Sequence, residues 1–207
     1  MNPLSHRIAC RKILPLVALV LGARGDTGAQ VARPSAPNAA ALAAFETVRQ
    51  VLQHPRCQNC HPAGDAPLQG DDSHAHAENV HRGTDGRGRI GEQCATCHGL
   101  ANLPSAYGAH VPPGSAEGWR MPPEYRKLVF VGVAPRALCE QIKDPQRNGG
   151  RDMAALREHL DTPLVRWGWS PGVGRAPVSI PRARFLAAWE TWTRAGAPCP
   201  VTSAASH

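Results

Sequence analysis

Apolar residues recur at helical spacing in four segments of this chain, and long polar stretches separate those segments. The first predicts a helix over 38–53 with one buried face, because its apolar residues lie three or four positions apart. These residues are Leu42, Phe45, Val48 and Leu52. Asn38 suits the N-cap of this helix, and Pro55 suits its end.

Three further helices are predicted in the C-terminal half. One begins at Pro135, a favoured first-turn residue, and another follows Asp152, which suits an N-cap. The last runs from Pro181 to about Ala195 and ends at Gly196. The inward-facing residues are Leu138, Cys139 and Ile142 in the first of these, Met153, Leu156 and Leu160 in the second, and Phe185, Trp189 and Trp192 in the third.

The segments between these helices have no sustained period and are rich in Gly, Pro and polar residues. Segments 62–93 and 100–124 are predicted as long loops, the first with a few short turns of helix, and 164–180 as a packed loop. Residues 86–91 match Gly-x-Gly-x-x-Gly, but no strand precedes them, so they predict a turn rather than a dinucleotide site. No strand pattern is convincing. We therefore predict a mostly α fold with long loops.

The N-terminal 30 residues have the pattern of a secretory signal peptide. A basic start at Arg7, Arg11 and Lys12 precedes a short apolar run over 13–23. This run is too short to span a bilayer, so we expect a periplasmic protein with no membrane span in the mature chain. The predicted organisation is a signal peptide over 1–30, a flexible lead-in over 31–37, one domain over 38–200 and a disordered tail over 201–207.

The charge of the chain gives no evidence for a nucleic-acid partner. The formal net charge of +7 falls to +4 once residues 1–30 are removed. The other basic residues are dispersed, with no basic run interleaved with aromatic residues. We therefore expect no nucleic-acid binding.

Two C-x-x-C-H motifs carry the chemistry of the chain. They are Cys57-Gln-Asn-Cys60-His61 and Cys94-Ala-Thr-Cys97-His98. Two thiols three residues apart can form thioethers with one porphyrin, and the next histidine can bind the iron as proximal ligand. The motifs predict two covalently bound c-type haems, with thioethers at Cys57, Cys60, Cys94 and Cys97 and proximal ligands His61 and His98.

A zinc site and a pair of disulfides or redox dithiols are the alternatives for four such cysteines. Neither requires a histidine directly after each pair, so the haem interpretation is preferred. The motifs begin 37 residues apart, roughly half the length of an independent cytochrome c domain, so we expect both haems in one compact dihaem cytochrome c-like domain.

The second axial ligand of each iron is open from sequence. We favour His76 for the first haem, with His81 and His74 as alternatives in the same loop. For the second haem we favour His159, beside the apolar face of a predicted helix. Met121 is its main competitor as distal ligand, and His110 is a further candidate. Methionine ligation raises the potential of a haem, whereas an open site would allow peroxide chemistry.

Two cysteines, Cys139 and Cys199, are left after those of the haem motifs and Cys10 in the signal peptide. An even pair in an oxidising compartment predicts a disulfide, with two buried free thiols as the alternative. This bond would close a loop of about 60 residues, worth about 4 kcal/mol in the chain-entropy model.

The chain resembles the bacterial cytochrome c superfamily through its two C-x-x-C-H motifs. Over 45–200 it also resembles small secreted dihaem proteins labelled as isoquinoline 1-oxidoreductase subunits. The matching stretches include 108–114 (Gly-Ala-His-Val-Pro-Pro-Gly), 164–169 (Leu-Val-Arg-Trp-Gly-Trp) and 196–200 (Gly-Ala-Pro-Cys-Pro). The resemblance implies an electron carrier beside a dehydrogenase.

We therefore expect the protein to pass electrons from a periplasmic dehydrogenase to a respiratory acceptor through its two haems, without being a catalytic subunit. The alternative is a dihaem peroxidase-like enzyme with one open iron.

Overall fold

The structure is a computed structural model and describes residues 35–201. These residues belong to one structural unit. The predicted signal peptide, most of the lead-in and residues 202–207 lie outside the described residues. None of the helices between residues 35 and 201 is both long and apolar enough to cross a membrane.

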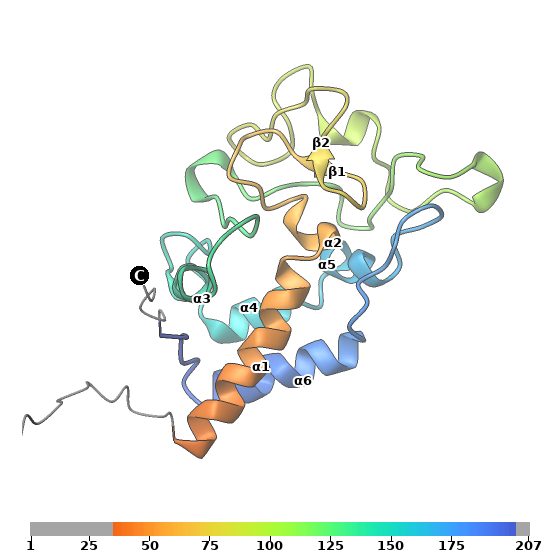
Figure 1. Cartoon of the computed structure of the whole chain (residues 1–207). Coiled ribbons are helices and arrows are strands. Elements are labelled where there is room, and N and C mark those ends of the chain that lie inside the picture. The colour runs from red at the N-terminus through yellow and green to blue at the C-terminus, as the bar shows by residue number, and fades with distance from the viewer. Residues whose placement is uncertain (1–34, 202–207) are drawn as a thin grey trace, which may run out of the picture. The chain divides into compact units, whose positions relative to one another are not determined.

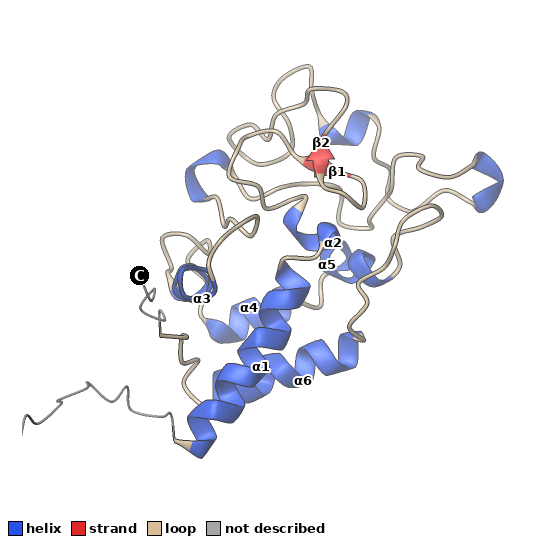
Figure 2. Cartoon of the chain, viewed as in Figure 1, coloured by secondary structure: helices blue, strands red, loops and turns tan. Residues whose placement is uncertain are grey.

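Helices make up most of the regular secondary structure of the described chain, and one very short hairpin is its sheet (Figures 1 and 2). The α-helices are α1 (Ala36–Leu52), α2 (Pro55–Gln58), α3 (Pro135–Lys143), α4 (Met153–His159), α5 (Pro163–Arg166) and α6 (Arg182–Arg194). Short 3-10 turns cover Cys94–Thr96, Ser105–Tyr107, Glu124–Arg126 and Trp167–Trp169. Strands β1 (Leu68–Gln69) and β2 (His74–Ala75) pair antiparallel, with Leu68 opposite Ala75.

The helices α1, α3, α4 and α6, which we call the helical region, enclose the apolar core. Helix α1 packs mainly on α6, and the rings of Phe45 and Trp192 lie 4.9 Å apart between them. Leu138 and Ile142 of α3 and Leu156 of α4 are buried in the same core. Burial of these apolar faces drives this part of the fold, as the helical spacing predicts.

A disulfide joins α3 to the C-terminal segment of the described chain. The Cα atoms of Cys139 and Cys199 are 5.5 Å apart, within the usual range for this bond. The indole Nε1 of Trp192 donates to the Pro198 carbonyl oxygen at 3.0 Å beside it. The predicted disulfide is therefore confirmed.

Residues 62–126, which we call the loop region, contain almost no buried apolar side chain. Prolines aside, Met121 is the one buried hydrophobic residue among them. The centre of the region is instead the buried Arg82, 1% exposed, whose guanidinium donates to the carbonyl oxygens of Pro62 (3.1 Å), Gly64 (2.5 Å) and Pro122 (2.9 Å). The loop region is therefore organised by polar contacts.

The predicted helices are confirmed, with differences at their ends. Helix α1 begins at Ala36, so Asn38 is inside the helix rather than at its N-cap. Asp152 does cap α4, since its carboxylate accepts from the Ala155 N–H at 2.8 Å. Gly196 has φ of 82° directly after the C-cap of α6, as expected.

Two expectations about the loops were wrong in detail. Residues 62–93 contain no helical turn and instead form the β1–β2 hairpin, which is too short to give an alternating pattern. Segment 164–180 is not wholly a loop, because α5 and the turn Trp167–Trp169 occupy its first part. Helix α1 ends at Leu52, ahead of Pro55 as expected, and Pro55 also begins α2. The run 86–91 is a turn, as predicted, with positive φ at all three of its glycines.

Candidate functional site

The first C-x-x-C-H motif starts in the short helix α2. The Nδ1 atom of His54 accepts the Arg56 N–H at 3.1 Å and so caps this helix. The chain then continues in a helical turn, in which the Cys60 N–H donates to the Cys57 carbonyl at 3.3 Å. The two thiols therefore lie one turn apart, as attachment to a single planar group requires.

The imidazole of His61 is held in one orientation and one tautomer. Its Nδ1 lies 2.6 Å from the Leu128 carbonyl oxygen, which can only accept, so Nδ1 carries the proton. The Phe130 ring stacks on the imidazole, with centroids 4.0 Å apart and planes inclined by 14°. The Nε2 atom therefore carries a lone pair that can bind a metal.

The segment that holds His61 is itself fixed by two glutamine side chains. Gln53, just after α1, donates to the carbonyl oxygens of Phe130 at 3.0 Å and Val133 at 2.8 Å. The buried Gln141 of α3 bonds to both backbone groups of Val129. The helical region thus positions the carbonyl that orients His61.

The second motif repeats this arrangement in the loop region. The Nδ1 of His98 donates to the Pro113 carbonyl oxygen at 2.8 Å, again leaving Nε2 with a lone pair. The indole of Trp119 stacks on the imidazole at 4.7 Å, with planes inclined by 2°. Trp119 in turn meets Trp167 edge to face at 4.8 Å. Both motif histidines therefore share one design: a carbonyl on Nδ1 and an aromatic ring on one face.

Burial keeps the motif side chains in their neutral forms. Desolvation lowers the pKa of His61 to about 3, assisted by the neighbouring His159 and Arg82, and it also lowers the pKa of His98. Desolvation raises the pKa of Cys57 to about 12 and that of Cys60 to about 11. At neutral pH the imidazoles are therefore unprotonated and these thiols keep their protons.

The four motif cysteines form no disulfide with one another in the described chain. Among residues 35–201, no three His, Cys, Asp or Glu side chains gather as a group that could hold a metal ion.

A cavity of about 350 Å³ opens beside the first motif. Its volume falls within the usual range of cofactor and ligand sites, about 300–1,000 Å³. The wall is largely apolar, with side chains from α2, α4, α5 and the segment around Met121. Basic side chains also line it: Arg56, Arg120, Arg126, Arg147 and Arg151. The cavity therefore suits a large apolar group that carries acidic substituents.

The structure brings His159 and Met121 to the wall of this cavity, together with His61. His76 lies instead beside His98, with ring centroids 6.3 Å apart. We expected His76 near the first motif and His159 near the second, so each lies beside the other motif. Met121 was considered for the second centre and also lies with the first.

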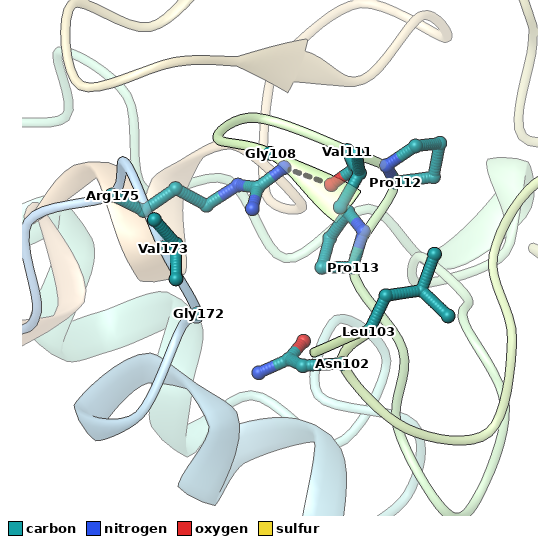
Figure 3. Close-up of a pocket in the computed structure, with 9 residues that line it drawn as sticks. All are labelled: Asn102, Leu103, Gly108, Val111, Pro112, Pro113, Gly172, Val173 and Arg175. Atoms are coloured by element: carbon teal, nitrogen blue, oxygen red, sulfur yellow. Dashed lines mark hydrogen bonds between the residues drawn. The ribbon is translucent and has the colours of Figure 1, made fainter. Parts of the chain in front are cut away.

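The other candidate histidines are engaged elsewhere. His74 is exposed and pairs with Asp72 at 2.6 Å, and His81 pairs with Glu92 at 3.0 Å. His110 is exposed in a turn, with φ of 63°. The next residue, Val111, lines a second, very small pocket (Figure 3), where Arg175 donates to the Val111 carbonyl at 2.5 Å and Asn102 also contributes to the wall. This pocket lies between two loops and has room for little more than a water molecule.

Sequence reasoning missed the groups that orient the two imidazoles. Leu128 and Pro113 act through backbone carbonyls, which the side-chain pattern does not reveal. Phe130 and Trp119 gave no sequence signal that links them to the motif histidines. Comparisons of the chain with protein-family models, with curated proteins and with solved structures each found no match.

Proposed function

We propose that this protein is an extracytoplasmic electron-transfer protein with two covalently bound haems, one at each C-x-x-C-H motif. The observation that carries the proposal is the common setting of His61 and His98. A histidine that binds a metal through one ring nitrogen usually donates the N–H of the other to a carbonyl or carboxylate. Both motif histidines do so, at Leu128 and Pro113, and burial favours their neutral form.

The neutral thiols fit covalent attachment of haem. Each S–H group adds across one vinyl double bond, so that sulfur joins one carbon, hydrogen joins the other, and no electron is gained or lost. Zinc, in contrast, needs several ligands gathered around one point, and among residues 35–201 no three His, Cys, Asp or Glu side chains gather in that way.

The cavity beside His61 supports the same assignment. Its apolar wall matches a porphyrin face, and its arginines offer charge-assisted hydrogen bonds to propionate carboxylates. Bound there, haem supplies one-electron exchange between ferric and ferrous iron. The chain supplies His61 as an axial ligand, Leu128 to orient it, and walls that limit access of water.

Electron transfer is favoured over peroxide chemistry because each motif histidine has a second ligand candidate nearby. His76 lies beside His98, and both His159 and Met121 lie on the cavity with His61. A six-coordinate iron has no open position for peroxide. We propose a dehydrogenase as electron donor and a respiratory acceptor as the destination, as the sequence resemblance implies.

The proposed location is the periplasm. The disulfide between Cys139 and Cys199 supports an oxidising compartment, where such bonds persist. The same compartment is implied by the signal-peptide pattern of residues 1–30.

Expression of the full chain in a bacterial host that matures c-type cytochromes tests the proposal. We expect a pyridine haemochrome spectrum typical of haem with two thioethers, and a content of two haems per chain. The purified protein should be reduced by ascorbate or dithionite and reoxidised by an electron acceptor, with negligible turnover of peroxide. Absence of covalent haem, or rapid peroxide turnover, would refute the electron-transfer proposal.

A further inference from the structure

The relation between His76 and His98 has the dimensions of an axial ligand pair. Their ring centroids are 6.3 Å apart and their planes are inclined by 55°. Two imidazoles that bind one iron from opposite sides, with iron–nitrogen distances of about 2.0 Å, have ring centroids about 6.3 Å apart. The hairpin after the first motif thus carries a histidine to the distance that the second motif requires.

The surroundings of His76 leave its outer nitrogen available. Its Nδ1 lies 2.7 Å from a carboxylate oxygen of Glu78, without the alignment of a hydrogen bond, and the side chain is 18% exposed. An adjacent carboxylate is a common partner of a metal-binding imidazole. In His74 both ring nitrogens are engaged, Nδ1 by Asp72 at 2.6 Å and Nε2 by Gln69 at 3.0 Å.

The ligand candidate for the centre at His61 is His159. It is the last residue of α4 and lies on the wall of the same cavity as His61. No group among residues 35–201 forms a hydrogen bond with the His159 ring. The ring is therefore free to bind a metal in the cavity.

We infer that axial ligation is crossed between the two motifs: His76 completes the centre at His98, and His159 completes the centre at His61. This inference rests on the proposed function, because it concerns the ligands of the proposed haems. It implies that each centre depends on a segment distant from its own motif. The second centre requires the β1–β2 hairpin, and the first requires α4.

Variants that retain a single haem test the crossing directly. The double replacement C57A/C60A should leave only the second haem, and C94A/C97A only the first. With only the second haem present, His76→Ala should convert it from low to high spin, whereas His159→Ala should have no effect. With only the first haem present, His159→Ala should convert it from low to high spin, whereas His76→Ala should have no effect. Electron paramagnetic resonance and the optical spectrum of the oxidised protein report the spin state.

His74→Ala is the matched control, since His74 lies in the same hairpin but has both nitrogens engaged. It should leave either haem low-spin. Added imidazole should restore the low-spin spectrum of His76→Gly and His159→Gly, which separates loss of a ligand from unfolding. If removal of both cysteines prevents folding, Cys57→Ala or Cys94→Ala alone retains one thioether and marks that haem by a shifted absorption band.

The pairing is overturned if His76→Ala changes the spin state of the first haem, or leaves the second low-spin. A methionine–iron charge-transfer band at the first haem, abolished by Met121→Ala, would overturn the assignment of His159. A parent protein without any covalent haem would refute the proposed function itself. If two haems are attached but their spin states do not change in these variants, only the pairing is refuted.

Discussion

The helical region and the loop region are stabilised by different physical means. In the helical region, the side chains of Phe45, Leu138 and Trp192 are at most 1% exposed, and the disulfide crosses the edge of this core. In the loop region, the deepest side chain is the charged Arg82, and its partners are backbone carbonyls. One region is held by apolar burial and the other by hydrogen bonds from a buried arginine to backbone carbonyls and by tight turns.

This difference explains why the two motif sites differ in enclosure. The first motif adjoins the apolar core, with Cys57 packed against it, and faces a cavity of about 350 Å³. The second motif lies in the loop region, where Cys97 is exposed and Leu100 is 70% exposed. The same five-residue pattern therefore occurs in one enclosed and one open setting.

Replacement of Arg82 by Met should have the largest effect on this comparison. It removes the donors of three carbonyl oxygens at the centre of the loop region. Each buried carbonyl oxygen left without a donor typically costs about 1–3 kcal/mol. We expect hydrogen exchange to accelerate throughout 62–126 while α1 and α6 stay protected. Uniform loss of protection in both regions would show that they are not separate in stability.

Removal of the disulfide should act on the other region. The variant C139A/C199A opens a loop of 60 residues, which lowers the free energy of unfolding by about 4 kcal/mol in the chain-entropy model. Urea denaturation followed by far-ultraviolet circular dichroism measures this loss. The environments of His61 and His98 should change little in the folded variant. A variant as stable as the parent would contradict the role of this bond.

Gly86→Ala tests how tightly the turns of the loop region are packed. Gly86 has φ of 81°, and a Cβ atom there would overlap the Met121 carbonyl oxygen. We expect a loss of more than about 2 kcal/mol in unfolding free energy, because both backbone strain and a backbone clash are introduced. Thermal denaturation gives the value.

Gly91→Ala is the control for that substitution. Gly91 has φ of 85° but nothing within 4 Å of an added Cβ atom. Only the left-handed backbone conformation is penalised, so the expected loss is about 1 kcal/mol. Equal losses at Gly86 and Gly91 would mean that the close approach of Gly86 to Met121 contributes nothing.

The smallest predicted effect is a pH dependence of stability, which arises at His54 between α1 and α2. Neutral His54 accepts the Arg56 N–H and caps α2, and desolvation lowers its pKa from the usual value of 6.5. Because the folded state resists protonation of His54, the stabilisation that this cap gives is complete above pH 6.5 and is lost as the pH falls below that value. An N-cap is worth about 1 kcal/mol.

The substitution His54→Asn retains a capping acceptor that does not titrate. Melting temperatures measured against pH should therefore fall less steeply for this variant than for the parent below pH 6.5. Identical slopes would exclude His54 as a contributor.

The predictability of the fold follows the same division. The buried positions of α3, α4 and α6 were predicted because helical periodicity reports burial directly, and the Cys139–Cys199 bond followed from the number of cysteines. The hairpin and the role of Arg82 could not be predicted. Two-residue strands give no periodic signal, and a buried arginine looks like any surface arginine in sequence.

The site was predictable only in its motif residues. Their spacing identified the two pairs of thiols and the two adjacent histidines, whereas the groups around them depend on how the loops return. His76 and His159 were each expected beside one motif histidine, and the structure places each of them near the other one. Nearness along the chain did not predict which motif histidine lies beside His76, because the β1–β2 hairpin brings His76 to His98.

The intact mass of the denatured protein tests the central claim most directly. After maturation in a host that attaches haem to C-x-x-C-H motifs, the mature chain should carry the added mass of two haems. The variants C57A/C60A and C94A/C97A should each carry one, and the quadruple variant none. A parent protein with the mass of the bare mature chain would contradict the proposal of two covalently bound haems. So would a parent protein that carries a single haem and keeps it in either double variant.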